Sequence, residues 1–276
     1  MNCNKCDERA VLLKPRLCKK HFIAYFEGKV FEEIEKENIS GEITVACSGG
    51  KDSTTILFLL HKFGVKVKAL AVNEGIKGYR DASLESLKKF CSDLGVELEV
   101  FSFKNEFGKT LDEIMRVKNH SCKYCGVLRR NLLNKHATNL LATGHNLDDE
   151  SQAAFMNLVS GRKELFPGGK KEIKNLVRRI KPLKYCTEKE VMTYSFLKNF
   201  PVDFNECPNL KNSQREKIRD LLNSIEVEKP GTKENILRRF ESINIKKDGK
   251  IKFCRICNNP TRREVCNACN IIEEIK

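Results

Sequence analysis

Long apolar stretches are missing from this chain of 276 residues. No run approaches the roughly 20 residues that a membrane-spanning helix requires, and the N-terminus lacks the charged-then-apolar layout of a secretion signal. Internal repeats and low-complexity tracts are absent as well. We therefore expect a soluble, cytoplasmic protein with no membrane partner.

Acidic residues are in short supply relative to basic ones. The chain has 37 Asp and Glu against 51 Lys and Arg, a formal net charge of +14. Such an excess predicts a polyanionic partner, and nucleic acid is favoured over a membrane because no basic amphipathic anchor helix stands out. The segment 162–184 is the most basic, and we expect a mobile loop laid along a phosphate backbone. A merely solvated basic surface is the alternative.

The chain is organised around residues 42–63, which read EITVACSGGKDSTTILFLLHKF. The β-branched run 43–47 has the length of a buried strand, and apolar residues recur at helical spacing from Ile56 to Phe63. Gly49 and Gly50 lie between this strand and this helix and allow close backbone approach. The backbone amides that follow lie at a helix N-terminus, which favours anions. The spacing does not match a Walker A loop. We predict a nucleotide-phosphate loop; a glycine turn with a serine cap is the alternative.

Strand and helix patterns alternate along the rest of the central region. This alternation predicts an α/β fold with a parallel, doubly wound sheet whose ligands bind at the carboxyl ends of the strands. Asp81 is the expected cap of the helix that Gly95 ends. The expected strands span 43–47, 66–73, 96–102 and 140–143, and the expected helices span 23–37, 51–63, 81–95, 110–118, 188–199, 214–223 and 234–243.

The segment GHNLDDE, residues 144–150, follows the fourth strand and opens another helix. Asp148 and Asp149 could simply be favourable acids at a helix N-terminus. Together with Asp52, they could instead bind Mg²⁺ and orient a triphosphate, since both ends of the crevice then carry an acid.

Ten of the thirteen cysteines lie in short metal-binding groupings or beside a proline, so metal sites are favoured over disulfides. Both terminal groups have the spacing of closed, four-ligand structural zinc sites. Arg255, Arg262 and Arg263 decorate the second group and could touch nucleic acid or only solvent. The N-terminal set is Cys3, Cys6, Cys18 and His21, and the C-terminal set is Cys254, Cys257, Cys266 and Cys269.

Three further cysteines, Cys122, Cys125 and Cys207, cannot complete a closed zinc site. Three thiolates suit an iron–sulfur cube with one iron left open, which can hold a sulfide. The competing chemistry is a redox pair in which one cysteine carries a persulfide and another releases the sulfur. Cys47, Cys91 and Cys186 are expected to be buried structural thiols.

SGGKDS resembles the PP-loop of ATP pyrophosphatases, and the order of the motifs narrows the resemblance. An N-terminal zinc knuckle, the PP-loop, CxxC, GHNxDDE, a lone Glu-Cys-Pro and a terminal zinc ribbon resemble the tRNA 2-thiouridine synthetases of the TtuA and NcsA group. Residues 74–81 and 125–130 are more similar to enzymes that act on the wobble uridine of the anticodon than to those that act on the T-loop uridine.

The resemblance implies ATP-dependent 2-thiolation of a tRNA uridine. The implied cofactors are ATP, Mg²⁺, a [4Fe–4S] cluster on Cys122, Cys125 and Cys207, and two Zn²⁺. Asp52 and Asp149 join these cysteines as catalytic residues. The implied partners are tRNA, a sulfur donor (sulfide or a thiocarboxylated ubiquitin-like protein) and a second copy in a homodimer. The implied ATP site comprises Ala46, Ser48, Gly49, Gly50, Lys51, Asp52, Ser53, Val72, Arg129, Gly144 and Asp149.

The expected division of the chain has four parts: a zinc finger over 1–27, the catalytic domain over 28–215, a helical tRNA-binding extension over 216–248 and a zinc ribbon over 249–276. Two rival functions remain at this stage. A tRNA lysidine synthetase shares the loop but needs no cysteine trio. A non-catalytic tRNA-binding subunit would keep the nucleotide fold only as a scaffold, which the complete SGGKDS and DDE motifs disfavour.

Overall fold

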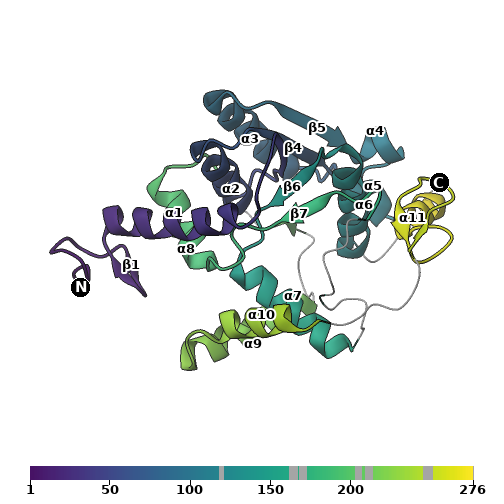
Figure 1. The fold of residues 1–276 in the computed structure, drawn as a ribbon. Helices are drawn as coiled ribbons and strands as arrows, with labels where there is room; N and C mark the ends of the chain where they lie inside the picture. The colour runs from purple at the N-terminus through teal and green to yellow at the C-terminus, as the bar shows by residue number, and fades with distance from the viewer. Residues whose placement is uncertain are drawn as a thin grey trace.

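A parallel five-stranded sheet forms the centre of the computed structural model (Figure 1). Within the described part of the chain, no helix is long and apolar enough to cross a membrane. The predicted α/β class is confirmed. The structure describes residues 1–117, 121–161, 167, 173–202, 207–208, 214–244 and 251–275, with only the backbone described at 121–123 and 214.

The order of the strands reverses beside β3 (Ile43–Ala46). From β3 the chain first builds outward through β4 (Val67–Asn73) and β5 (Leu98–Ser102), then returns to the other side of β3 with β6 (Leu140–Thr143) and β7 (Arg178–Ile180). All four pairings are parallel. The loops after β3 and β6 therefore diverge at the switch point where such sheets bind their ligands.

Each face of the sheet has its own apolar core, because β4 sends alternate side chains to opposite faces. Ala69 and Ala71 lie in the first core, and Leu70 and Val72 lie in the second. The first core takes in α1 (Lys19–Glu35), α2 (Lys51–Lys62), α3 (Arg80–Leu94) and α8 (Glu188–Leu197). The second takes in α4 (Phe103–Phe107), α5 (Leu111–Met115), α6 (Ser121–His136) and α11 (Asn267–Ile275).

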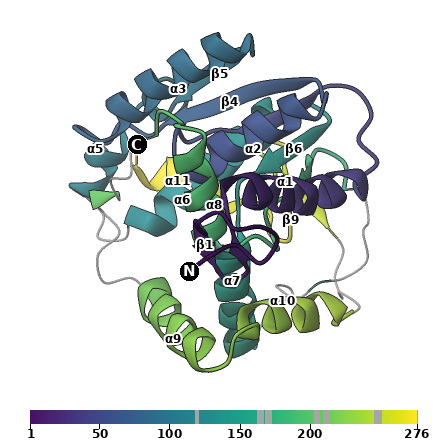
Figure 2. The same ribbon diagram turned by 90° about the vertical axis from the view of Figure 1, so that its left-hand side faces the viewer.

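A separate helical layer consists of α7 (Leu147–Ser160), α9 (Gln214–Glu228) and α10 (Thr232–Ser242). Figure 2 shows α9 and α10 beside α7, away from the sheet. Gly231, with φ of +90°, lies between α9 and α10 at the N-cap position of α10. Buried apolar side chains in this layer include Leu147 and Ala154 of α7, Leu222 of α9, and Leu237 and Phe240 of α10.

The two terminal cysteine modules lie at opposite ends of the molecule and belong to different cores (Figure 1). The N-terminal module contains β1 (Leu12–Leu13) and β2 (Arg16–Leu17), and its Cys3 and Cys18 join the first core. The C-terminal ribbon contains β8 (Lys252–Phe253) and β9 (Pro260–Thr261) and joins the second core.

Two local predictions are wrong. Asp81 does not cap α3: the cap position is Tyr79, without a side-chain hydrogen bond, and Arg80 turns into the interior instead. The predicted basic loop contains strand β7, whose two arginines are exposed while Ile180 is buried. A three-residue edge strand with only one buried side chain leaves no periodicity to detect. Residues 162–166 and 168–172 of that segment lie outside the described residues.

Candidate active site

The loop after β3 is shaped by its own serines and by one close backbone contact. Ser48 N donates to Ser53 Oγ (3.1 Å), and Ser53 Oγ donates to the carbonyl of Gly50 (3.1 Å). Gly49 has φ of +80°, and a Cβ there would lie 2.4 Å from the carbonyl oxygen of Ser83. No side chain caps α2. Its first amides therefore remain able to bind an anion.

Lys51 lies between two carboxylates at the start of α2. Its Nζ is 3.0 Å from Asp52 Oδ2 and 3.0 Å from Glu188 Oε1. Burial lowers the pKa of this ammonium, but the two carboxylates outweigh that effect and raise it. Lys51 is thus a fixed cation. Sequence reasoning missed Glu188, because only folding brings the first turn of α8 to this loop.

The loop after β6 meets the phosphate loop directly. A Cβ on Gly144 would lie 2.8 Å from the backbone nitrogen of Ser53, so glycine is required for this approach. Asn146 Nδ2 donates to Asp52 Oδ1 (2.9 Å), and Asn146 Oδ1 accepts from Asp149 N (3.1 Å). The structure therefore brings both predicted motifs to the switch point and joins them through one asparagine.

Asp149 has the electrostatics of a cation ligand. The pKa of Asp149 is raised to about 6. Burial is the largest cause and the charge of Asp52 also raises this pKa, whereas Arg215, whose Nη2 lies 3.2 Å from Asp149 Oδ1, lowers it. Asp52 and Asp149 are only partly buried, and a divalent ion between them would relieve their mutual repulsion. Asp52 and Asp149 thus fit Mg²⁺.

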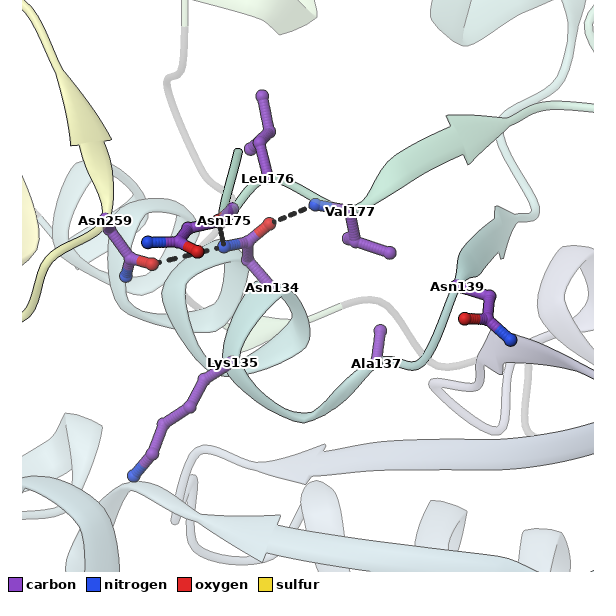
Figure 3. A pocket seen from close by; sticks show the side chains of 8 residues that line it. All are labelled: Asn134, Lys135, Ala137, Asn139, Asn175, Leu176, Val177 and Asn259. Atoms are coloured by element: carbon purple, nitrogen blue, oxygen red, sulfur yellow. Dashed lines mark hydrogen bonds between the residues drawn. The ribbon is translucent and has the colours of Figure 1, made fainter. Parts of the chain in front are cut away.

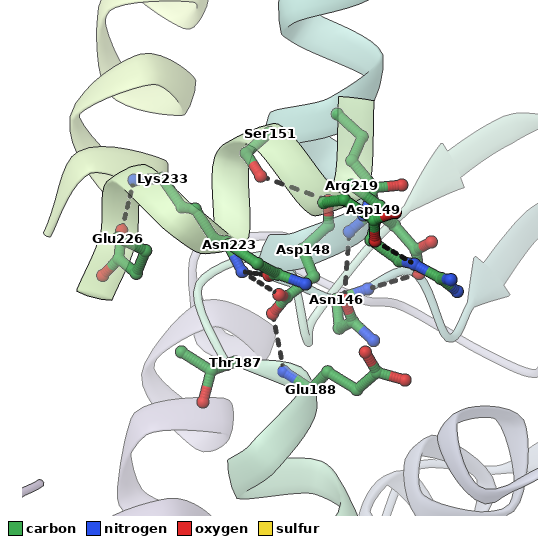
Figure 4. A network of polar contacts seen from close by, with 12 residues as sticks. Asn146, Asp148, Asp149, Ser151, Thr187, Glu188, Arg219, Asn223, Glu226 and Lys233 are labelled. Carbon is green, nitrogen blue, oxygen red and sulfur yellow. Dashed lines mark hydrogen bonds and ion pairs between the residues drawn. The ribbon is translucent and has the colours of Figure 1, made fainter. Parts of the chain in front are cut away.

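Asp148, the neighbouring acid, faces a different set of groups (Figure 4). Its carboxylate accepts from Glu188 N (2.8 Å) and pairs with Lys233 of α10, and both side chains of that pair are buried. Lys233 also donates to Asn223 Oδ1. Asp148 therefore anchors α8 and α10 to α7, as a helix N-terminal acid rather than a group of the crevice.

Val72 and Arg129, both expected at the ATP site, lie on neighbouring elements. Val72 is near the end of β4, and its carbonyl accepts from Arg80. Arg129 on α6 places Nη1 3.6 Å from Glu74 Oε1. Ala46 is the last residue of β3. Sequence reasoning singled out neither Glu74 nor Arg80 as site residues, since their burial is decided by packing.

Two of the three expected iron–sulfur ligands pack against the same core. Cys125 and Cys207 are half-buried and pack against the second core, although they lie far apart in the sequence. The side chain of Cys122 lies outside the described residues. By contrast, burial raises the pKa of the thiols of Cys91 and Cys186, which lie in the first core as predicted.

The N-terminal thiols and imidazole form a compact cluster. Nδ1 of His21 is 3.4 Å, 3.5 Å and 3.4 Å from Sγ of Cys3, Cys6 and Cys18, and the last two sulfurs are 3.6 Å apart. A tetrahedral ion with zinc–ligand bonds of about 2.0–2.3 Å requires ligand separations of about 3.5–3.8 Å. The four groups fit a structural zinc.

The C-terminal thiols form a second cluster, all within 4.8 Å of one another. Cys257 and Cys266 Sγ are 3.6 Å apart, and backbone amides donate to Sγ of Cys254 (3.3 Å) and Cys266 (3.4 Å). Amide donors stabilise thiolates, the form that binds metal. These residues also fit zinc.

A cavity of about 410 Å³ lies at the other end of the sheet, where β6 and β7 begin (Figure 3). Asn139 and Val177, which line it, directly precede β6 and β7. The amide of Asn134 donates to the carbonyl of Asn175 (2.9 Å) and to Oδ1 of Asn259 (3.3 Å). Because these amide groups hydrogen-bond to one another, the cavity lies along the contact between α6 and the C-terminal ribbon.

Comparisons with known proteins agree with this geometry. Residues 25–225 match the model of a PP-loop domain. The tRNA 2-thiolation protein NcsA of Haloferax volcanii is 32% identical over 100% of this chain and 99% of its own length. The tRNA-5-methyluridine(54) 2-sulfurtransferase of Pyrococcus horikoshii is 32% identical over 98% of this chain and 93% of its own length.

A solved structure extends the similarity to three dimensions. The U34-tRNA thiolase NcsA from Methanococcus maripaludis, with its [4Fe–4S] cluster, superposes with a TM-score of 0.87 at 32% identity, covering 99% of this chain and 96% of that one. These matches span almost the whole length of both chains. The chain therefore belongs to the PP-loop family of tRNA 2-thiolation proteins.

Proposed function

We propose that this protein is an ATP-dependent tRNA-uridine 2-sulfurtransferase that acts on the wobble uridine. The observation that carries the proposal is the meeting of SGGKDS and GHNxDDE at the switch point, beside the helix that holds Cys125. The same fold, at full length, carries a U34-tRNA thiolase in the Methanococcus relative.

The proposed reaction replaces the C2 oxygen of uracil by sulfur. Because this carbonyl is a poor electrophile, its oxygen first attacks the α-phosphorus of ATP, the α–β anhydride bond breaks, and pyrophosphate leaves. Hydrosulfide then forms the C2–S bond, and the C2–O bond breaks as AMP leaves with the former carbonyl oxygen. Uridine, ATP and hydrosulfide give 2-thiouridine, AMP and pyrophosphate, and the proton of hydrosulfide passes to the phosphate products, so no electrons are consumed.

The chain's own groups support the first step by holding charge and geometry. The amides at the start of α2 and the ammonium of Lys51 bind phosphate oxygens, which must displace Glu188 from Lys51. Asp52 and Asp149 are the residues that would hold Mg²⁺, and a divalent ion there would supply positive charge beside the phosphates. Arg129 faces the same crevice from α6.

Cys122, Cys125 and Cys207 are the proposed ligands for the sulfur-transfer step. A [4Fe–4S] cluster with three cysteine ligands leaves one iron open, which can present hydrosulfide. Cys125 and Cys207 are half-buried against the apolar second core, which would shield bound hydrosulfide from part of the solvent. The two terminal clusters take structural Zn²⁺.

The remaining assignments concern location, assembly and partners. We place the protein in the cytoplasm as a homodimer that takes sulfur from sulfide or from a thiocarboxylated ubiquitin-like protein. The division at 27, 215 and 248 is kept as a proposal, with the helical extension over 216–248 binding tRNA.

Anaerobic purification followed by a thiolation assay tests the function. About four irons and two zincs per chain are expected, and mass spectrometry should find 2-thiouridine in tRNA incubated with ATP and sulfide. Transcripts that carry cytidine at position 34 or at position 54 separate the two target sites. Loss of product only with the second transcript would assign the T-loop. Zinc without iron after reconstitution would favour a persulfide, and absence of AMP with intact tRNA would contradict the enzyme.

A further inference from the structure

A buried arginine joins the end of β4 to the phosphate loop that follows β3. Arg80 is 4% exposed and lies at the start of α3. Its Nε (2.9 Å) and Nη2 (2.6 Å) donate to the carbonyl of Val72, while Nη1 donates to the carbonyl of Ser48 and to Ser83 Oγ (3.2 Å). One rigid guanidinium therefore fixes the end of β4 and the first residue of the phosphate loop relative to each other.

The charge of Arg80 is compensated inside the protein. Glu74 is 5% exposed, and its Oε2 lies 3.0 Å from Arg80 Nε. A buried ion pair is weak evidence for stability, because desolvation of both charges offsets their attraction. The directions of its contacts are more informative. The guanidinium of Arg80 donates to two backbone carbonyls beside the crevice, those of Val72 and Ser48, and its other partners are Ser83 and Glu74.

The second oxygen of Glu74 faces the cysteine side of the crevice. Oε1 lies 3.6 Å from Nη1 of Arg129, which is half-exposed and sits four residues after Cys125 on α6. At this exposure the ion pair contributes little to stability. It does orient the guanidinium of Arg129 toward the crevice, from the helix that carries a proposed cluster ligand.

We propose that Glu74 and Arg80 are positioning residues for adenylation: they hold the phosphate loop, the carbonyl of Val72 and Arg129 in the geometry that the reaction requires. Neither side chain touches the reacting atoms. The proposal rests on the proposed function in one respect only, namely that ATP binds in this crevice. Misplacement of reacting groups by about 1 Å can cost on the order of 100-fold in rate.

Three variants test the proposal. R80K keeps the charge but loses the fork, E74Q keeps the shape but loses the charge, and S83A removes one mild contact and should fold in any case. E27Q is the matched control, because Glu27 is a partly buried carboxylate of α1 that binds Lys62 and Tyr194 away from the crevice. Thermal unfolding places all four variants on one stability scale.

For R80K and E74Q we expect kcat for pyrophosphate release with tRNA to fall by about 10- to 100-fold, while the dissociation constant for ATP changes by less than about threefold. S83A should lose about two- to fivefold in kcat. E27Q should lose thermal stability without this pattern. Values of kcat within about twofold of the parent in both R80K and E74Q, at a stability loss equal to that of E27Q, would overturn the proposal.

Hydrogen exchange adds a readout that does not depend on turnover. Amides of residues 48–53 and 72–74 should exchange faster in R80K and S83A than in the parent, and should be unchanged in E27Q. Unchanged exchange in both R80K and S83A would also overturn the positioning role. If the parent itself makes no thiouridine, the proposed function fails, while the exchange data still decide whether Arg80 holds the loop.

Discussion

The two faces of the sheet have similar cores but different chemistry. The first core is a closed apolar interior that contains the N-terminal module, α1, α2, α3 and α8. The second core contains fewer buried residues, and it borders Cys125 and Cys207 and includes the C-terminal ribbon. The proposed phosphate-binding amides lie on the first side, at the N-terminus of α2, while Cys125 and Cys207 pack against the second core. The crevice between the β3 and β6 loops is where both sides can reach one substrate.

The two terminal metal modules repeat this difference. The N-terminal cluster extends the first core along α1, and the described buried residues of that core include none of the predicted ATP-site residues. The ribbon places Cys254, Cys266 and Cys269 in the same core as Leu128 and Leu132 of α6. The two modules therefore have similar ligand sets but pack in different cores. Their position in the fold, rather than their ligand chemistry, is what distinguishes them.

The largest expected effect comes from removing one cysteine on each side. C207A should abolish thiolation and cluster retention and should spare ATP binding, because three thiolates are needed to hold the cluster. C186A, in the first core, should keep activity and lose only about 1 kcal/mol of unfolding free energy. Iron content, thiouridine yield and ATP titration measure both variants. Full activity with a retained cluster in C207A would remove Cys207 from the ligand set.

Removing one ligand from each terminal module should give a smaller but unequal effect. C257S should lower thiolation by about tenfold or more, because loss of the ribbon metal loosens the packing on α6 that positions Cys125. C6S should lose the other metal and unfold the N-terminal module, but should keep activity at low temperature. Zinc content verifies the loss in each case. Equal inactivation by C6S would end the functional distinction between the modules.

Acidification should weaken nucleotide binding through Asp149. The folded-state pKa of Asp149 is raised to about 6, above its ordinary 3.8, so the native state binds the extra proton between these values. The free energy of unfolding then falls as pH rises through this window, and D149N should remove that fall. Affinity for Mg²⁺-ATP should weaken as pH drops through 6, while the visible absorption of the cluster stays unchanged. An affinity that is flat between pH 5 and 7 would exclude Asp149 as a metal ligand.

The smallest expected effect concerns the hydrogen bonds that Asn134 of α6 makes beside the C-terminal ribbon. Asn134 makes three hydrogen bonds, to Asn175, Val177 and Asn259, so N134A should lower the unfolding free energy by about 1–2 kcal/mol. N4A, which removes one exposed contact with Arg16 in the N-terminal module, should change it by less than about 0.5 kcal/mol. Urea titration of both variants, with metal bound, compares the two attachments. A larger loss in N4A would reverse the comparison.

The sequence by itself determined the features that depend on neighbouring residues. Strand–glycine–helix order predicted the phosphate loop, and strand 140–143 matches β6. Cysteine spacing predicted two clusters whose ligand atoms do converge. These signals are local, since a β-run, a glycine turn or a CxxC knuckle owes its geometry to residues a few positions apart. The basic segment and the Asp81 cap failed because β7 gains its order from β6, and Arg80 gains its orientation from buried partners.

Only the tertiary structure decided which distant groups meet. Glu188 reaches Lys51 across 137 positions, Lys233 reaches Asp148 across 85, and the ribbon packs on α6 although the two are far apart in the chain. Glu74 and Arg80 form a buried pair and are close in sequence. Their residue types alone do not predict that the guanidinium of Arg80 donates to the carbonyls of Ser48 and Val72. Ion pairs and docking surfaces have no periodicity, because burial and distance are set by the packing of whole elements rather than by the residues that take part.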